Sequence, residues 1–316
     1  MIDLAPIALF VYNRPNHTMQ TIESLSSNIL ANESDIYIFS DNAKNKDEEY
    51  NINKVRSLIK NIKGFKSLTI IEREFNYGLA KSIIDGVTEV INKYGKIIVL
   101  EDDVVTSPYF LKFMNDALNI YKNKEQIWGV SGRQYPISSV NLPDAFFLDH
   151  ISCTGWGTWD YKWIYYNKNP DIYLQKISSK KDIYKFNHYG SSNIYSQLNL
   201  NKNGKINTWA IFWEAEIFIN NGLFLFPSKS LINNIGFDKS GVHCNETLIT
   251  DCGDLYNNII NIDNQNIPLK INKIALKRIR DFRFKYFPIK KYMFKKYKRK
   301  FINLLKKILK YNIFTK

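Results

Sequence analysis

The sequence predicts an α/β fold with a mostly parallel sheet flanked by helices, on two observations. Over the first 130 residues, short apolar runs alternate with longer amphipathic segments, the order of βαβ units with right-handed crossovers. The run 96–100 contains four successive apolar residues, as expected of a strand buried on both faces. The second half differs in character, because all six tryptophans lie between Trp128 and Trp213.

Local patterns place the individual elements. Pro108 stands where a helix begins, since proline suits the first helical turn. After Gly78, five apolar residues between Ile83 and Ile91 have helical spacing. The segment 155–159, Gly-Trp-Gly-Thr-Trp, is expected to be a compact aromatic loop. Besides the helix after Gly78, we expect strands over 7–12, 35–39, 67–71, 96–100, 127–131 and 223–226, and helices over 17–30, 46–62, 108–121 and 208–220.

The positive charge is concentrated at the C-terminal end. Residues 270–316 hold 18 of the 44 Lys and Arg and one of the 30 Asp and Glu, a net charge of +17, which leaves −3 for residues 1–269. Between Phe301 and Lys310, apolar residues and lysines fall on opposite sides of a helix. We therefore expect a basic amphipathic tail that docks on an anionic membrane surface. A helix packed on the body and a disordered tail remain alternatives. Nucleic-acid binding is disfavoured because the body is nearly neutral.

The sequence also bounds the compartment. No apolar stretch reaches 18 residues, so no transmembrane helix is expected, and no signal peptide is recognised. Cys153, Cys244 and Cys252 have no paired metal-binding spacing, which fits a reducing compartment. We therefore expect a cytoplasmic protein.

Three carboxylates, Glu101, Asp102 and Asp103, directly follow the apolar run 96–100. Because a core does not accept unpaired charges, we expect this acidic triplet at the carboxyl edge of the sheet, where open α/β folds bind ligands. Clustered carboxylate oxygens suit Mg²⁺ or Mn²⁺, often shared with a phosphate-bearing substrate. The alternative is an acidic N-terminus of the next helix. No G-x-G-x-x-G follows the first strand and no P-loop occurs, which argues against dinucleotide enzymes and P-loop NTPases.

These motifs, in this order, resemble GT-A-fold (Rossmann-like) glycosyltransferases, most of all the N-acetylglucosaminyltransferase I group (family 13) and related bacterial family 2 enzymes. The resemblance runs from about residue 6 to 252. Asn-Arg-Pro after the first strand implies that Arg14 contacts the nucleotide. The second-strand acid implies that Asp41 recognises uridine. The triplet resembles the metal motif of the family, which implies that Asp103 binds the metal and Asp102 faces the ribose or donor sugar.

Two further segments carry the resemblance. Residues 76–81 resemble the wall of the nucleotide pocket, which implies that Lys81 faces the diphosphate, unless it is a plain surface lysine. Phe-Trp-Glu at 212–214 resembles Phe-Trp-Asp of the family, whose acid is the catalytic base. Because glutamate is one methylene longer, Glu214 and Glu216 both remain candidates. A surface acid without a catalytic role is the alternative for Glu214.

The resemblance also reaches a loop after residue 236. Residues 237–242 resemble the Phe-x-x-x-Gly-Val loop that closes over the donor, which implies donor contacts for Gly241 and Val242. His243 replaces a serine of the pattern and is expected either to reach the metal or the diphosphate as a neutral imidazole, or to be a polar surface residue. The acceptor or sugar pocket is expected to include three tryptophans, with core packing as the alternative: Trp156, Trp159 and Trp213.

The resemblance implies a metal-dependent inverting transferase, with Mn²⁺ or Mg²⁺, that moves a sugar such as N-acetylglucosamine from a UDP-sugar to a glycan or lipid-linked hydroxyl. Surface polysaccharide synthesis at the inner face of the bacterial membrane fits this activity. We expect a nucleotide-sugar-binding half (1–130), an acceptor-binding and catalytic half (131–265) and a basic tail (266–316). A non-catalytic glycan- or nucleotide-sugar-binding scaffold and a sugar nucleotidyltransferase remain alternatives, the latter disfavoured because no Gly-rich loop follows the first strand.

Overall fold

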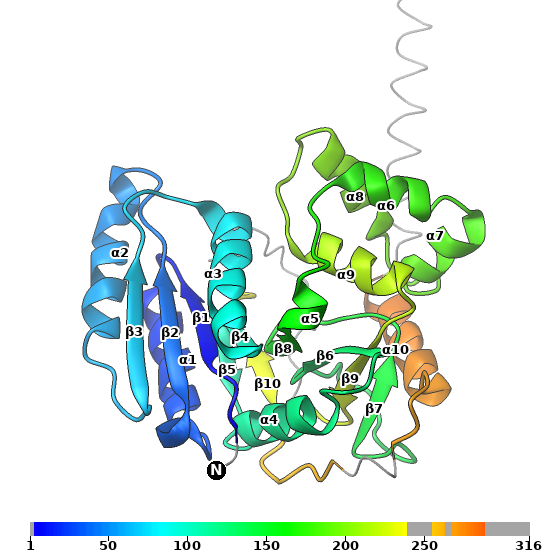
Figure 1. Ribbon diagram of the computed structural model, residues 1–316, viewed down its shortest axis with the longest axis horizontal. Helices are drawn as coiled ribbons and strands as arrows, with labels where there is room; N and C mark the ends of the chain where they lie inside the picture. The colour runs from blue at the N-terminus through cyan, green and yellow to red at the C-terminus, as the bar shows by residue number, and fades with distance from the viewer. Residues whose placement is uncertain (1–2, 239–254, 263–266, 288–316) are drawn as a thin grey trace, which may run out of the picture.

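The computed structural model describes residues 3–238, 255–262 and 267–287. In these residues the chain folds around one large mixed sheet (Figure 1). Its strands are β1 (Ile7–Val11), β2 (Asp35–Ser40), β3 (Ser67–Glu72), β4 (Lys96–Glu101), β6 (Ile127–Ser131), β7 (Ala145–Leu148), β8 (Trp156–Trp159) and β9 (Leu223–Pro227).

The strand order across this sheet is β3-β2-β1-β4-β8-β6-β9-β7. The first four strands are parallel, and β9 is parallel to β6. β8 runs antiparallel to both β4 and β6, and β7 runs antiparallel to β9. The predicted α/β class with a mostly parallel sheet is therefore confirmed.

Helices cover both faces of the sheet, as the division of the buried core into two main clusters shows. One cluster receives α1 (Pro15–Ser26), α2 (Lys46–Ile59) and α4 (Phe110–Ile120). The other receives α3 (Gly78–Tyr94), α5 (Asp160–Trp163), α9 (Ala210–Ile219) and α10 (Lys273–Tyr286). The remaining helices are η1 (Ala31–Glu33), α6 (Pro170–Lys176), α7 (Lys180–Phe186) and α8 (Tyr195–Lys202).

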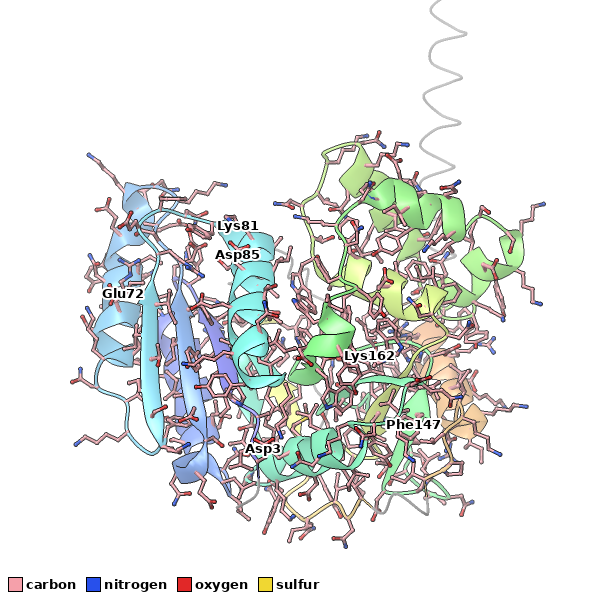
Figure 2. All side chains as sticks on the ribbon, viewed as in Figure 1. Asp3, Glu72, Lys81, Asp85, Phe147 and Lys162 are labelled. Carbon is pink, nitrogen blue, oxygen red and sulfur yellow. The ribbon has the colours of Figure 1, made fainter. Side chains whose placement is uncertain are left out.

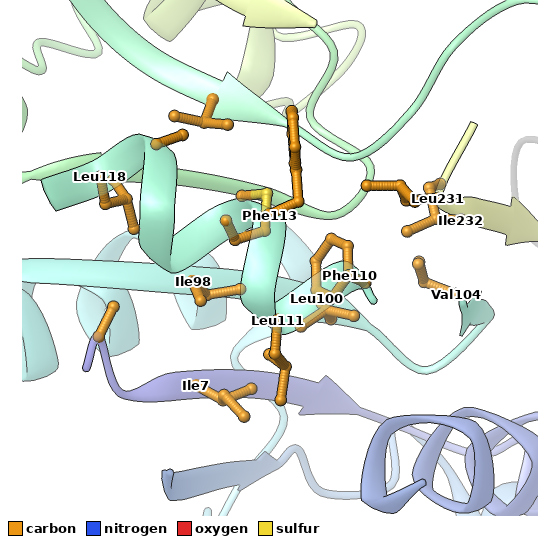
Figure 3. Close-up of a cluster of buried hydrophobic side chains, with 14 of the residues drawn as sticks. Ile7, Ile98, Leu100, Val104, Phe110, Leu111, Phe113, Leu118, Leu231 and Ile232 are labelled. Carbon is orange, nitrogen blue, oxygen red and sulfur yellow. The ribbon is translucent and has the colours of Figure 1, made fainter. Parts of the chain in front are cut away.

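The core beneath α4 shows how the apolar pattern becomes packing (Figure 3). Phe110 and Leu111 of α4 lie against Leu100 of β4, and all three are almost fully buried. Removing such side chains from water is the main term that stabilises the fold. The strand that carries the acidic triplet is thus anchored by its own apolar residues.

The main departure from the sequence prediction is the segment 155–159, which was expected to be a loop. Its last four residues form β8 in the middle of the sheet. Trp156 and Trp159 lie in the two opposite core clusters, as the alternation of a strand requires. A Cβ on Gly157 would lie 2.8 Å from the carbonyl oxygen of Ile97. Glycine is therefore needed for the close approach of β8 to β4.

A second, two-stranded sheet returns the chain to the acidic triplet. β5 (Val104–Thr106) pairs antiparallel with β10 (Ile232–Asn234), and Asn234 is opposite Val104. The N–H of Ile235 donates to the carbonyl of Asp103 at 2.9 Å. Residues more than 120 positions apart thus meet at the end of β4.

Helix α10 packs on the body of the protein. Ala275, Ile279 and Phe282 are buried, and Asn272 donates its N–H to the carbonyl of Phe147 at 2.9 Å. Arg278 donates to the carbonyls of Ser138 and Val140, both at 2.7 Å. Residues 273–286 thus form a helix packed on the body, which was one of the alternatives for the tail in the sequence analysis.

The amphipathic pattern between Phe301 and Lys310 lies outside the described residues. Among those that are described, no helix is both long and apolar enough to cross a membrane.

The docking of α10 predicts a clear difference between two isoleucines of the same helix. Ile279→Ala should lower the free energy of unfolding by about 2–4 kcal/mol, because it leaves a cavity in the core. Ile274, which is 49% exposed, is the matched control. Ile274→Ala should change the free energy of unfolding by less than about 0.5 kcal/mol. Chemical denaturation of the full chain measures both. Equal small effects would mean that α10 is not part of the folded body.

Candidate active site

Several polar residues meet at one edge of the large sheet. β1, β2 and β4 are parallel, and β6 runs the same way because both β4 and β6 are antiparallel to β8. Arg14 shortly follows β1, Asp41 follows β2, the acidic triplet ends β4, and Arg133 shortly follows β6. Open α/β sheets bind ligands at this edge.

Arg14 is the centre of the first group. Its Nη2 atom donates to Asp102 Oδ1 and, at 2.9 Å, to Asp103 Oδ2. Burial disfavours the charge of Arg14, but the two carboxylates outweigh this and raise its pKa above the ordinary value. The main chain of Asp102 is also fixed, since the hydroxyl of Thr21 donates to its carbonyl at 2.8 Å. Arg14 and the triplet, far apart in sequence, therefore form one cluster.

The charges of this cluster do not balance. Burial first, and then Asp103 and Asp102, raise the pKa of Glu101 to about 8. Burial also raises the pKa of Asp102, although Arg14 opposes it. Three carboxyl groups thus share one guanidinium, and further positive charge would stabilise their ionised forms.

The oxygen donors of the triplet fit Mg²⁺ or Mn²⁺, both of which prefer carboxylate ligands. Within residues 3–238, 255–262 and 267–287, no group of three or more His, Cys, Asp or Glu side chains is arranged to hold a metal ion. A metal ion at Asp103 remains a proposal.

The segment after β10 closes around Asp103. A Cβ on Gly236 would lie 2.1 Å from Asp103 Oδ2 and 3.0 Å from Arg14 Nη1. The amide of Asn234 lies 3.4 Å from Asp103 Oδ1. Any side chain at position 236 would displace the carboxylate, so glycine is needed for the close approach of this segment to Asp103.

Asp41 lies at the N-terminus of α3. Its carboxylate accepts the N–H groups of Tyr77 and Gly78, each at 2.8 Å, and the N–H of Asn42 at 3.0 Å. Asn76 adds a side-chain contact at 3.3 Å. A carboxylate here is stabilised by the helix dipole. Asp41 thus fixes the turn into α3, and its implied contact with uridine remains a proposal.

Lys81 lies one turn into α3, where it pairs with Asp85 of the next turn (Figure 2). Its side chain is 54% exposed, and its Nζ lies 4.8 Å from the centre of the Tyr77 ring. The position matches the plain surface lysine of the sequence analysis, and a contact with the diphosphate remains a proposal.

Glu214 of α9 lies in a second polar group. Its Oε1 is hydrogen-bonded to Nε2 of His188, and the ring of His188 lies 4.7 Å from that of His150. Burial is the main cause that raises the pKa of Glu214 to about 8; His150 opposes it and Asp149 supports it. A carboxylate with a raised pKa is a stronger proton acceptor once it is ionised.

An unusual loop delivers His188 to Glu214. His188, Tyr189 and Gly190 have successive positive φ angles of 48°, 55° and 79°. For the two residues with side chains this backbone is unfavourable, and such strain is typical of functional sites. Tyr189 donates its hydroxyl to Asp149, which fixes the loop on the second half of the protein.

Cys153 links the two polar groups. Burial is the main cause that raises the pKa of its thiol, and the charges of Glu214 and Glu101 raise it further. Both carboxyl groups therefore lie within electrostatic reach of one side chain. The candidate base and the acidic triplet belong to one region of the molecule.

Glu216 has a different environment from Glu214. Its Oε2 accepts the hydroxyl of Tyr173 at 2.7 Å, and its Oε1 accepts the side-chain amide of Asn220 at 2.9 Å. The residue is buried against α6. Residues two apart on a helix point to different sides, so the two glutamates serve different parts of the structure.

The three tryptophans proposed for a sugar pocket are core residues. Trp156 and Trp213 have no exposed surface, and Trp159 is 2% exposed. Their rings pack on other aromatic residues or, for Trp159, donate to the carbonyl of Leu118 at 3.0 Å. The three tryptophans therefore pack in the core, which was the alternative in the sequence analysis. A sugar cannot reach rings that are enclosed in this way.

Gly241, Val242 and His243 lie outside the described residues. The segment that leads to them ends beside the triplet, where His17 Nε2 lies 3.1 Å from Asp238 Oδ2. The sequence analysis did not identify His188, His150, Asp149 or Arg133. The only available signal was that the chain has four histidines in all.

No protein-family model matches the chain, and no curated protein matches it. Among solved structures, the chain is similar to the mannosyltransferase PcManGT from Pyrobaculum calidifontis, solved with GDP-Man and Mn²⁺. The identity is 7% over 70% of this chain and 72% of that one, with a TM-score of 0.36.

It is also similar to TarS of S. aureus, at 12% identity over 72% of this chain and 59% of that one, with a TM-score of 0.39. An active-site mutant of LgtC matches at 12% identity over 56% of this chain and 68% of that one, with a TM-score of 0.31. The likeness is to GT-A glycosyltransferases and concerns the arrangement of strands and helices. It assigns neither a family nor a function.

Proposed function

We propose that the protein is a metal-dependent inverting glycosyltransferase that uses a UDP-sugar as its donor. The observation that carries this proposal is the acidic triplet at the end of β4, joined to Arg14 and flanked by Gly236. The group is short of positive charge, lies at the ligand-binding edge of the sheet, and shares its region with a buried base candidate. The sequence resemblance described above supplies the reaction class.

In this proposal Asp103 holds the metal, Mn²⁺ or Mg²⁺, which when bound supplies positive charge for the diphosphate leaving group. Arg14 keeps Asp102 and Asp103 at fixed positions. Gly236 lies beside this cluster, and closure of the following residues 237–242 over the donor rests on the sequence resemblance alone. Asp41 orders the start of α3 next to the nucleotide.

Glu214 is the catalytic base. Its Oε atoms take the proton from the acceptor hydroxyl as the oxygen attacks the anomeric carbon, and no covalent intermediate is required. His188 holds the carboxylate in place through Nε2. The buried surroundings keep the carboxylate poorly solvated, which makes it a better proton acceptor. Glu216 is engaged by Tyr173 and Asn220 and acts in packing.

The acceptor is a glycan or a lipid-linked hydroxyl, and surface polysaccharide synthesis is the process that we propose. Attraction to an anionic membrane surface rests on the net charge of residues 270–316 alone. N-acetylglucosamine as the donor sugar rests on the sequence resemblance alone.

The donor and metal assignment predicts how UDP binds. Calorimetric titration of UDP should give tight binding with Mn²⁺ and at least tenfold weaker binding without it, because a metal held by Asp103 would supply positive charge to the diphosphate. Asp103→Asn should remove the effect of Mn²⁺. Asp85→Asn on the surface of α3 is the control and should behave as the wild type. Equal binding with and without Mn²⁺ would contradict the metal site, and no UDP binding would contradict the proposed function.

The base assignment predicts a contrast between two glutamates of α9. Glu214→Gln should lower turnover by about 10²–10⁴-fold, the usual contribution of a general base, with little change in UDP binding. Glu216→Gln should lower it less than tenfold, because the amide oxygen still accepts from Tyr173. UDP release from the preferred donor measures both variants. The reverse order of effects would transfer the role to Glu216.

The pH dependence follows from the raised pKa of Glu214, about 8. The base acts in its ionised form, so kcat/KM should rise with a midpoint near pH 8 and level off about one pH unit above it. The other titratable or charged groups that face Glu214 or its partners are His188, His150, Asp149, Cys153 and Tyr135. Because His150 lowers the pKa of Glu214, His150→Gln should move the midpoint to higher pH. A midpoint that stays unchanged in this variant would contradict the assignment of the profile to Glu214.

A further inference from the structure

A cavity of about 330 Å³ lies between α10 and the second half of the protein. Arg133 and Tyr135 line it from the segment after β6, and Arg283 and Phe287 line it from the end of α10. The residues 191–193, Ser-Ser-Asn, complete the lining. The volume lies in the range of small-molecule pockets, about 300–1,000 Å³. No role has yet been given to this cavity.

The lining is positively charged and has hydrogen-bond donors without partners. Nε of Arg133 and Nη1 of Arg283 are buried and donate to no partner within the described residues, and the hydroxyl of Ser192 also has no hydrogen-bond partner there. No carboxylate in the described part of the chain pairs with either arginine. Buried polar groups without partners are costly and need an explanation. An anion that accepts these hydrogen bonds provides one.

Tyr135 holds the two arginines together. Nε and Nη2 of Arg283 donate to its hydroxyl at 3.2 and 2.5 Å. The guanidinium carbons of Arg133 and Arg283 lie 5.5 and 5.0 Å from the centre of its ring. Although burial acts in the opposite direction, Arg283 and Arg133 lower the pKa of Tyr135. Both guanidinium groups thus contact the same tyrosine, and positive charge around one ring suits a ligand of opposite charge.

The cavity adjoins the candidate base. Ser191 and Ser192 follow the left-handed loop that delivers His188 to Glu214, and the hydroxyl of Ser191 donates to the carbonyl of His188 at 2.7 Å. The charge of Glu214 also acts on Tyr135. A molecule in the cavity would thus lie beside the loop that carries His188, the hydrogen-bond partner of Glu214.

We infer that this cavity is the acceptor subsite and that it binds a phosphate group of the acceptor through Arg133, Arg283 and Ser192. Three donors from three separate segments match the several oxygens of a phosphate, and the remaining volume accommodates the alcohol that the phosphate carries. The position next to Glu214 then presents a hydroxyl of the same molecule to the base. The inference rests on the proposed function for its acceptor role, whereas anion binding can be measured without it.

The experiment is calorimetric titration of glycerol phosphate into the full chain in chloride buffer, without nucleotide. We expect saturable binding that weakens at least tenfold in Arg133→Gln and in Arg283→Gln, with Arg283→Lys between them and the wild type. Lys277→Gln removes the same charge from an exposed position of α10 and should bind as the wild type. Thermal unfolding of each variant identifies any that do not fold. If Arg283→Gln does not fold, Arg133→Gln still tests the inference, because Arg133 lies outside α10.

Three results would overturn the inference. These are binding of glycerol as tight as that of glycerol phosphate, wild-type binding by both arginine variants, and displacement of the phosphate compound by UDP with Mn²⁺. Displacement would assign the cavity to the donor diphosphate. Loss of phosphate binding in Arg133→Gln with UDP binding retained supports the inference. If UDP does not bind the wild type at all, the proposed function fails while the anion site is judged by its own titration.

Discussion

The ion pairs of Arg14 with Asp102 and Asp103 are the interaction on which the candidate site depends. They require the end of β1 to lie beside the end of β4, which the parallel register of Phe10 with Glu101 provides. With one guanidinium among three carboxyl groups, the negative charge of the ionised cluster is only partly compensated. A further positive charge would stabilise it. The apolar residues of β4 and α4 hold it in place. The fold thus stabilises an arrangement that its charges alone would not.

The second constraint is that helix α9 places neighbouring side chains in two core clusters and in the candidate site. Trp213 packs in the core of the sheet, Phe212 packs against α6 and α8, and Glu214 faces the histidines. Because a helix turns by about 100° per residue, these three neighbours point in different directions. A substitution of the base candidate therefore changes the site with little effect on either core cluster, whereas Glu216 is part of the packing.

The sequence allowed good prediction where one local pattern decides the structure. The strands of the first half and the position of the triplet follow from runs of apolar residues and the cost of burying charge. β8 was missed because Gly157 reflects a close approach to Ile97, which exists only in the folded chain. His188 was missed because a left-handed loop brings it to Glu214 across 26 positions, and no spacing rule describes such a contact.

Helix α10 shows why the same pattern had two interpretations. A basic amphipathic helix buries its apolar side equally well against a protein core or a lipid surface, so periodicity cannot distinguish them. The structure adds the partners: Ile279 enters the core, Arg278 binds backbone carbonyls of residues 138–140, and Arg283 binds Tyr135. Part of the positive charge is therefore directed toward the protein. Arg283 lines the cavity for which we propose an anionic acceptor group, and a helix that faced only a membrane would not place a guanidinium there.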